Sequence, residues 1–488
     1  MYLIGIDVGT THTKIGIYRP SGKLISFRKI QTPLKKTETG GELYGDILFS
    51  AILDILREFY ESSPQLKKEK GYLGVSSLGE TVIPVSQEGK TLSPGLIWYD
   101  RRTVSIYKRI IEEIGKDYFI ERLLKNPGYF YSINKIVWLR DKYPELFNKI
   151  RWFLPVSSYI AFSFTHTACI DYSHAVRTMV FDPHTMDWDR RVLEKLNIDP
   201  EIFPPLCESG VAIETVPADV KEYLGISGDI VVSSGGHDHL VAALSMGLFE
   251  KNILFNSSGT TESIFLGLRR EELLKKDVSS FLSYGDITCH TVIDLCTAIA
   301  SMGTGGIAFE WFIRRILGRD LSYIEDLSYK RNDVFFMPRV LEVHGGSPQS
   351  AFLALGMEDD LTSLYSALME SLVFEIFDRT KALHKIEEEL PSTMRISGGP
   401  SQNSIYNQLK SDLFQKRIEI PKNREATLFG AALLGGIGGG VYKGYREAHE
   451  ETYEVEEVYY PTDNPYLFEK FERYKEFRKR YSKFLLED

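Results

Sequence analysis

The stretch GIDVGTTHTKIGIY, residues 5–18, places two apolar, β-favouring runs on either side of a short turn made of glycine and threonine. Runs of this kind separated by a short turn predict two strands joined as an antiparallel hairpin. Farther along, strand-like runs such as GYLGVSS alternate with helix-like stretches such as GDILFSAILDILREFYES, which predicts an α/β chain. The hairpin favours a mixed sheet over a purely parallel one.

The turn of this hairpin predicts a site for anionic oxygens. Gly9 lets the backbone bend, so the amides of Gly9, Thr10 and Thr11 can point inward as a nest, and Lys14 adds a positive charge. Asp7, at the strand end, would repel a phosphate unless a cation lay between them. The combination therefore predicts Mg²⁺, held by Asp7 through water and bridged to a polyphosphate. An ordinary hairpin loop is the alternative.

A related pattern recurs in the middle of the chain. The segment NILFNSSGTTESIFLGL again sets a Gly-Thr-Thr turn, residues 259–261, between two strand-like runs. We interpret this weak repeat as two domains of the same design, each offering a polar turn to a shared cleft. The predicted boundary follows the helix-like HLVAALSMG, which gives domains 1–247 and 248–488.

Composition and charge narrow the class of protein. The chain has 488 residues, 43% of them hydrophobic and 26% charged, as expected for a globular protein with more than one core. The net charge of −9 is spread without a basic stripe, which argues against nucleic acid as a partner. There is neither a signal-peptide pattern nor a membrane-spanning apolar run, so we expect a cytoplasmic protein. Four cysteines without CxxC spacing predict reduced core residues and no zinc site: Cys169, Cys207, Cys289 and Cys296.

Asp238, in the segment SSGGHDHLVAALSMG, is a candidate general base. It falls at a predicted strand-to-helix turn. A carboxylate fixed beside a phosphate site can accept the proton of an attacking hydroxyl. The alternative is that Asp238 is only the N-cap of the helix. A metal site formed by His237 and His239 is a further alternative, for which no other ligand is visible.

A third glycine-rich connection occurs in MRISGGPSQNSIYNQLKSDLF. A strand-like run ends at Gly398 and Gly399, and the following helix carries Asn403 near its start. Glycines without side chains let a flat ring lie against the backbone, which suits an adenine. A plain strand-to-helix connection is the alternative.

The last stretch, TDNPYLFEKFERYKEFRKRYSKFLL, predicts an amphipathic helix that begins near Asn464 and Pro465. Its aromatic residues recur at spacings of three and four, at Phe468, Phe471, Tyr474, Phe477, Tyr481 and Phe484. We expect this stripe to pack against the body of the protein, with a partner site as the alternative.

Taken together, these segments resemble the FGGY family of carbohydrate kinases, within the superfamily of actin, sugar kinases and Hsp70 ATPases. Eight segments match in the family's order, including GIDVGTTHTKIGIY, GVSSLGET, GLIWYDRRT, GGHDHLVAAL, NSSGTTESIF and GTGGIAFEWF. The resemblance implies two ribonuclease-H-like α/β domains, with mixed sheets flanked by helices, that clasp MgATP and a sugar or polyol in the cleft between them.

The resemblance also implies roles for individual residues. Asp7 looks like the carboxylate near Mg²⁺, and Asp238 looks like the catalytic base. The residues that look like ATP-binding positions are Gly9, Thr10, Thr11, Lys14, Gly259, Thr260, Gly306, Gly399 and Asn403. Those that look like substrate-binding positions are Glu80, Thr81, Trp98 and His239.

Two further positions bear on which substrate is bound. Gly79 stands where related glycerol kinases carry an arginine before Glu-Thr, which weakens a glycerol assignment because a bidentate donor is missing. Asp100 and Arg102, in the Trp-x-Asp-x-Arg segment, could contact substrate or pair with each other, and we favour the pairing.

We therefore expect ATP-dependent phosphorylation of a hydroxyl on a small sugar, a ketose or a related polyol. Alternatives are a glycerol or other polyol kinase, an actin- or Hsp70-like regulatory ATPase without a sugar acceptor, and a sugar-binding protein without catalysis. By resemblance alone, the chain could form a homo-oligomer, a dimer or a tetramer.

Overall fold

The computed structural model describes residues 1–339 and 349–484. The chain forms two compact units, each assembled from separated segments. The first unit comprises Met1–Phe249, Gly267–Thr297 and Glu425–Tyr453, and the second comprises Glu250–Leu266, Ala298–Arg424 and Glu454–Asp488. The first boundary lies two residues beyond the expected one, but two later segments return to the first unit, so the units are not contiguous halves.

A mixed sheet forms the centre of the first unit. Its strands follow the order β14 (Ala212–Thr215), β15 (Ile230–Ser233), β6 (Gly71–Ser77), β1 (Tyr2–Val8), β2 (His12–Tyr18) and β3 (Leu24–Gln31), and β16 (Gly236–His237) also pairs with β6. The pair β1–β2 is antiparallel and the pair β1–β6 is parallel. The predicted N-terminal hairpin and the mixed sheet are therefore confirmed.

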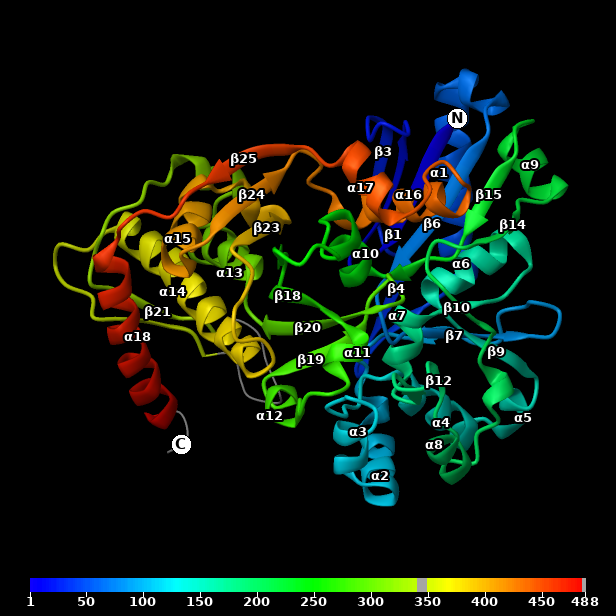
Figure 1. Cartoon of the computed structure of the whole chain (residues 1–488), viewed down its shortest axis with the longest axis horizontal. Coiled ribbons are helices and arrows are strands. Elements are labelled where there is room, and N and C mark those ends of the chain that lie inside the picture. The colour runs from blue at the N-terminus through cyan, green and yellow to red at the C-terminus, as the bar shows by residue number, and fades with distance from the viewer. Residues whose placement is uncertain (340–348, 485–488) are drawn as a thin grey trace. The chain divides into compact units, whose positions relative to one another are not determined.

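Helices cover both faces of this sheet because successive side chains of a strand point to opposite faces. Ile4 and Ile6 belong to the core that also contains residues of α1 (Gly45–Ser62) and α6 (Val156–Thr165). Leu3 belongs to the opposite core with residues of α16 (Ala426–Gly438), which lies over β1 and β6 (Figure 1).

α16 packs closely on β1 and β6 because both strands carry a glycine where the helix crosses them. A Cβ built on Gly5 would lie 2.2 Å from Leu428 O, and one on Gly74 would lie 2.1 Å from Ala431 O. Neither position has room for a side chain, so the helix backbone can contact the strands directly. Gly435 of α16 has the same role on the helix side, because its Cβ would lie 2.8 Å from Gly74 N.

A largely helical region follows β6 in the first unit and has its own apolar core. It contains β7 (Val82–Ser86), α2 (Val104–Ile114), α3 (Lys116–Glu121), α4 (Ser132–Lys142), α5 (Pro144–Phe147), β9 (Ile150–Pro155), β10 (Ile170–Asp171), α7 (Tyr172–Ala175), β11 (Phe181–Asp182), β12 (Asp187–Trp188), α8 (Arg190–Lys195) and β13 (Leu206–Cys207). The chain then returns to the sheet: α9 (Ala218–Leu224) precedes β15, and α10 (Asp238–Ser245) follows β16.

The second unit repeats the arrangement of β1, β2 and β6. The second sheet follows the order β19 (Gly285–Cys289), β20 (Leu295–Met302), β18 (Glu262–Arg269), β17 (Ile253–Ser258), β23 (Thr393–Ser397), β24 (Arg417–Pro421) and β25 (Val455–Tyr459). The pair β17–β18 is antiparallel and the pair β17–β23 is parallel. The weak sequence repeat thus corresponds to a structural repeat, with a Gly-Thr-Thr turn at the same place in each hairpin.

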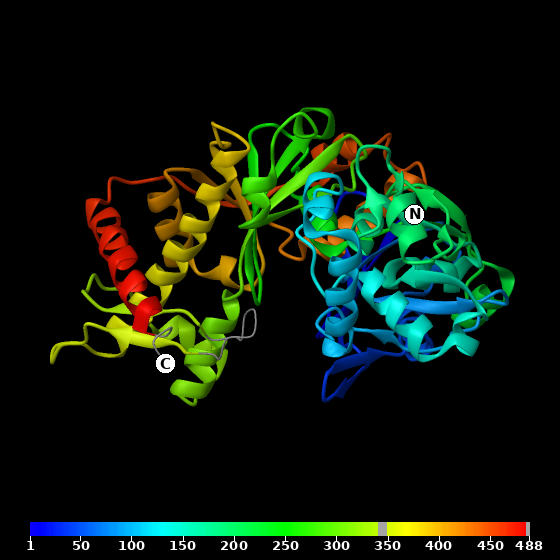
Figure 2. The same cartoon turned by 90° about the horizontal axis from the view of Figure 1, so that it is seen from below.

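The C-terminal helix α18 (Pro465–Phe484) packs beside α14 (Leu361–Thr380) within the second unit (Figure 2). Phe471 and Tyr474 are buried, and their rings lie 5.5 and 5.3 Å from that of Phe374. Docking on the body is therefore confirmed for these residues, whereas Phe468 is half-exposed and the side chain of Phe484 lies outside the described part.

All four cysteines are free; Cys289 and Cys296 are buried, but Cys169 and Cys207 are partly exposed. Within residues 1–339 and 349–484, every helix is too short or too polar to cross a membrane.

Candidate active site

The register of three strands brings two predicted carboxylates to one edge of the first sheet. Asp7 of β1 lies opposite Ser76 of β6, and Ser76 lies opposite Gly236 of β16. Asp238 begins α10 one residue after β16 ends. Asp7 and Asp238 are close enough for the charge of Asp238 to raise the pKa of Asp7.

The environment of Asp7 fits a cation. Burial raises the pKa of Asp7 to about 7, and Lys14 opposes the shift while Asp238 and Glu425 add to it. Ser76 Oγ donates to Asp7 Oδ1 at 3.0 Å. Carboxylate and hydroxyl oxygens are the ligands that Mg²⁺ prefers, and a divalent cation would offset the repulsion between these carboxylates.

Lys14, predicted to bind phosphate, is held by a residue that the sequence did not single out. Its Nζ lies 2.5 Å from Glu425 Oε2, and Glu425 directly precedes α16. The two residues are 411 positions apart in the chain, so no local pattern points to their contact.

The polar turn itself is closed by its own backbone. Gly9 N donates to His12 O at 3.0 Å, so the Gly9 amide closes the turn, and its predicted place in the anion nest is wrong; Thr10 and Thr11 follow at the tip. Trp98 Nε1 donates to Thr10 Oγ1 at 3.2 Å, and the indole is 40% exposed. The structure therefore brings Trp98, predicted on the substrate side, directly against the predicted phosphate turn.

The expected pairing of Asp100 and Arg102 is confirmed. Arg102 Nη2 lies 2.8 Å from Asp100 Oδ2, and Gly41 N donates to the same oxygen at 3.2 Å. Glu42 accepts from the other side of the guanidinium at 2.9 Å. These residues hold the chain around Trp98 in place.

The N-cap alternative for Asp238 is wrong in its detail. The N-cap of α10 is His237, and Asp238 is the first helical residue. Its Oδ1 accepts from His239 N at 2.7 Å, and the side chain is 26% exposed. The carboxylate is thus fixed at a helix N-terminus, and it keeps access to solvent.

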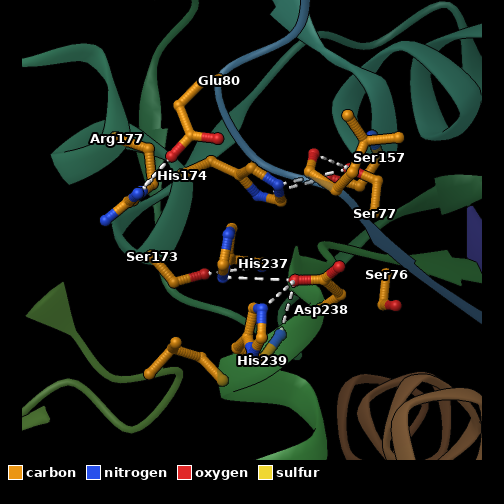
Figure 3. Close-up of polar contacts among 12 residues, drawn as sticks. Ser76, Ser77, Glu80, Ser157, Ser173, His174, Arg177, His237, Asp238 and His239 are labelled. Atoms are coloured by element: carbon orange, nitrogen blue, oxygen red, sulfur yellow. Dashed lines mark hydrogen bonds and ion pairs between the residues drawn. The ribbon is translucent and has the colours of Figure 1, made fainter. Parts of the chain in front are cut away.

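Glu80 and Arg177, which Figure 3 shows in the same region as Asp238, belong to a network of four charged residues; Glu80 and Lys125 are buried, and Asp286 is 27% exposed. Arg177 Nε donates to Glu80 Oε1 at 2.6 Å, and the same guanidinium pairs with Asp286. Lys125 Nζ lies 3.0 Å from Asp286 Oδ1. Glu80 adopts a left-handed backbone conformation, with φ of 61°, which aims its side chain at Arg177 at a local energetic cost.

Thr81, the other predicted substrate residue of this turn, is fully buried. Its Oγ1 has no hydrogen-bond partner. Buried polar atoms are normally satisfied, so an orphaned hydroxyl beside Glu80 suggests a partner that is bound there.

A series of buried hydrogen bonds links Asp171, His174 and Ser77. Asp171 Oδ2 contacts His174 Nδ1 at 2.7 Å, and His174 Nε2 contacts Ser77 Oγ at 3.2 Å (Figure 3). Burial lowers the pKa of His174, but Asp171 more than offsets this and the net shift is upward. Ser157 N donates to Ser77 Oγ at 2.9 Å, which ties α6 to the end of β6.

His237 and His239 stack with ring centroids 5.4 Å apart. The metal alternative for this pair finds no support, because the described residues include no group of three or more His, Cys, Asp or Glu side chains arranged to hold a metal.

In the second unit, three glycine-containing turns converge. Gly306 N donates to Gly259 O at 2.8 Å, and Thr260 O accepts from Gly305 N at 3.1 Å. A Cβ on Gly306 would lie 3.1 Å from Pro400, whereas one on Gly399 would meet nothing within 4 Å. The predicted residues Gly259, Thr260, Gly306 and Gly399 are thus neighbours, and Gly399 faces open space.

Asn403 has a structural role in the same region. Its Oδ1 accepts from Tyr406 N at 3.0 Å as the N-cap of α15 (Ser404–Phe414), and its Nδ2 donates to Tyr365 at 2.8 Å. A capping asparagine of this kind fixes the start of the helix.

A buried ion pair anchors the second turn. Lys410 of α15 pairs with Glu262, the residue that follows Thr261 and begins β18. Tyr406 donates to Glu262 Oε2 at 2.8 Å, and Lys410 Nζ donates to Asn256 at 2.7 Å.

The sequence did not single out several residues that complete the region around Asp238. These are Ser76, Lys125, Asp171, His174, Arg177 and Asp286. Asp171, His174 and Arg177 lie in the matching segment DYSHAVRTMVFD, which was a usable signal, whereas Lys125 and Asp286 lie in segments without a motif.

Known proteins match this chain over most of its length. It is 26% identical over 484 residues to a xylulose kinase of Staphylococcus epidermidis, with 96% of this chain and 94% of that protein covered. It is 25% identical over 465 residues to a glycerol kinase of Natranaerobius thermophilus, with 90% of each covered. The crystal structure of a "xyloylose kinase" from Brucella ovis superposes with a TM-score of 0.86 at 18% identity, covering 99% of this chain and all of that one, which shows the shared fold.

Family models match both parts of the chain. The N-terminal domain of the FGGY family of carbohydrate kinases matches residues 2–245, and the C-terminal domain matches residues 344–439. The first match alone spans half of the chain, and it contains the hairpin turn and Asp238. The chain belongs to the FGGY family of carbohydrate kinases.

Proposed function

We propose that this kinase transfers the γ-phosphoryl group of ATP to a hydroxyl of a ketose or a related polyol, with Asp238 as the general base. The observation that carries the proposal is the strand register that brings Asp238 to the same sheet edge as Asp7, beside the buried network of Glu80 and Arg177.

Asp238 would accept the proton of the substrate hydroxyl. As the hydroxyl oxygen forms its bond to the γ-phosphorus, the bond from phosphorus to the leaving oxygen of ADP breaks, and the hydroxyl proton passes to the Asp238 carboxylate. Partial exposure lets substrate reach this carboxylate, while its hydrogen bond from His239 N fixes its direction.

Several of the residues that the sequence predicts are assigned to the nucleotide and its metal. Asp7 would hold Mg²⁺, which when bound neutralises charge on the β- and γ-phosphates. The residues we assign to ATP are Thr10, Thr11 and Lys14 in the first unit and Gly259, Thr260, Gly306, Gly399 and Asn403 in the second. Lys14 would exchange its contact with Glu425 for the phosphates.

Glu80, Thr81, Trp98 and His239 would contact the sugar. The unpartnered Oγ1 of Thr81 and the exposed face of the Trp98 indole support this assignment. We further expect a cytoplasmic homo-oligomer, a dimer or a tetramer, which light scattering and cell fractionation would test.

The test is a coupled ADP-release assay with MgATP and a panel of D-xylulose, D-ribulose, glycerol and D-gluconate. Asp238→Asn should lower kcat by about 100-fold or more, because the general base is lost. Asp219→Asn removes the exposed carboxylate in the first turn of α9 and is the matched control, expected to leave turnover unchanged.

Three outcomes would contradict the proposal. ADP release that ignores every sugar would favour a regulatory ATPase, and binding of a sugar without turnover would favour a binding protein. Normal turnover by the Asp238→Asn variant would remove Asp238 from the role of base.

A further inference from the structure

A cavity of about 210 Å³ lies in the first unit, and we call it the Trp138 cavity. Its lining residues come from α4, α5, β7 and β9, from β5 (Gly40–Leu43) and β8 (Gly95–Leu96), and from the turns beside them. Tyr143, one of these residues, is 47% exposed, so the cavity opens to solvent there. Among the described residues, none of those assigned to ATP or to the sugar lines this cavity.

A helix face and a strand face form most of its walls. On α4, Trp138 and Leu139 follow Lys135 by three and four residues, so the three side chains share one face of the helix. Pro84 of β7 pairs with Phe153 of β9, and paired residues of neighbouring strands point to the same side. The two faces together make the walls largely apolar.

The volume of the Trp138 cavity fits one small ring system. An apolar cavity of about 150 Å³ holds a benzene molecule, so this larger one has room for an aromatic ring with a small substituent. Three of its lining residues are aromatic, namely Trp138, Tyr143 and Phe153. The rings of Trp138 and Tyr143 meet edge to face with centroids 5.8 Å apart, which is an arrangement that a further ring can extend.

One end of the cavity has unused hydrogen-bond donors. Arg102 donates two hydrogen bonds to Asp100 and one to Glu42, which leaves part of its N–H groups unused. Lys135 is 3% exposed, and in the described part of the chain its amine has one acceptor, Phe130 O. Lys135 lies near the same carboxylate, because the charge of Asp100 acts on its pKa. Buried donors that exceed their acceptors point to an acceptor that binds there.

The charges at this end favour an uncharged ligand. Two carboxylates, Asp100 and Glu42, share the Arg102 guanidinium. Burial lowers the pKa of Lys135 to about 7 against the opposing effects of Glu80 and Asp100, so the amine carries only part of a positive charge near neutral pH. A ligand carboxylate would add a further negative charge without a full cation to offset it.

We propose that the Trp138 cavity is a second ligand site, which takes a small uncharged aromatic compound with a carbonyl oxygen. The ring packs against the aromatic walls, and the carbonyl oxygen accepts from Arg102 and Lys135. This site does not depend on the proposed kinase function. It is connected to the Trp98 segment, because the guanidinium that would bind the carbonyl also pairs with Asp100.

Isothermal titration calorimetry with benzamide tests the proposal, because benzamide consists of one ring and one amide. We expect it to bind with a Kd of about 0.1–1 mM, one molecule per chain. Toluene lacks the acceptor and benzoate carries a charge, so each should bind at least about threefold more weakly than benzamide.

Variants locate the bound benzamide. Leu146 of α5 and Ser93 both line the cavity, so Leu146→Trp and Ser93→Phe should each fill it and weaken binding by about 10-fold or more. Glu145→Trp adds the same ring system at an exposed position of α5 outside the lining, and this matched control should bind as wild type does. Asp238→Asn should also bind benzamide normally, because Asp238 does not line the cavity.

The outcomes are independent of turnover, so this proposal and the kinase proposal can fail separately. Loss of binding in Leu146→Trp or Ser93→Phe, in protein with the circular dichroism of wild type, supports the site if both Glu145→Trp and Asp238→Asn still bind. Absence of binding at about 10 mM benzamide, or tighter binding of toluene or benzoate, refutes the proposal. Wild-type affinity in both cavity-filling variants, or loss of binding in Asp238→Asn, places the compound elsewhere and refutes it too.

Discussion

Removing the cation of a buried ion pair should destabilise the second unit strongly. Lys410 and Glu262 are 1% and 0% exposed, and Lys410→Met would leave the Glu262 carboxylate with the single donor Tyr406. An uncompensated buried charge costs about 3–5 kcal/mol. A unit of this size shifts its melting temperature by about 2–4 °C per kcal/mol, so we expect a decrease of roughly 6–20 °C in the unfolding of this unit.

Differential scanning calorimetry and urea unfolding would measure this change. The matched control is Lys422→Met, which breaks the exposed pair with Glu454, at 67% and 61% exposure, and should have no measurable effect. Lys410→Met combined with Glu262→Gln should recover most of the loss, because no charge is then left buried. A Lys410→Met protein within about 1 kcal/mol of wild type, or a double variant less stable than the single one, would refute the reasoning.

Three further changes test other parts of the first unit. Gly74→Ala should lower the free energy of unfolding in urea by about 1–3 kcal/mol, because its Cβ would lie 2.1 Å from Ala431 O; an unchanged value would show that α16 can move away freely. Asp171→Asn should destabilise more at pH 6 than at pH 9. The reason is that Asp171 raises the pKa of His174 against the effect of burial. The protonated His174 therefore stabilises the fold fully below the unfolded-state pKa of about 6.5, and this stabilisation is lost as the pH rises through the folded-state pKa. Equal losses of stability at both pH values would contradict this. Arg177→Met should lower the free energy of unfolding by about 3–5 kcal/mol, because it leaves the buried Glu80 carboxylate without its cation while Asp286 keeps Lys125, and urea unfolding close to that of wild type would show that the network relaxes.

Local patterns predicted the parts of the fold that depend on neighbouring residues. The hairpin turns at residues 9–11 and 259–261 and the start of α18 at Pro465 follow from turn chemistry and periodicity, and the structure contains all three. The pairing of Asp100 with Arg102 could also be predicted, because the two residues are adjacent in one short segment.

Contacts between distant segments could not be predicted in the same way. Glu425 meets Lys14 because α16 returns to the first sheet, and nothing in the sequence around either residue encodes that return. Similarly, Asp286 pairs with Arg177 across 109 positions. The charges around Asp238 depend on these partners, which is why the sequence indicated the chemistry of this region but not its ion pairs.

The position of α16 has a consequence for how this protein is made. One face of β1 and β6 lacks its covering helix until residues 426–438 have been synthesised, long after the strands themselves. Ribosomes add about 5–20 residues per second, so this apolar face is exposed for tens of seconds during translation. The nascent chain should therefore depend on chaperones until its last hundred residues emerge, and a premature stop anywhere before residue 426 should yield an aggregating fragment instead of a folded first unit.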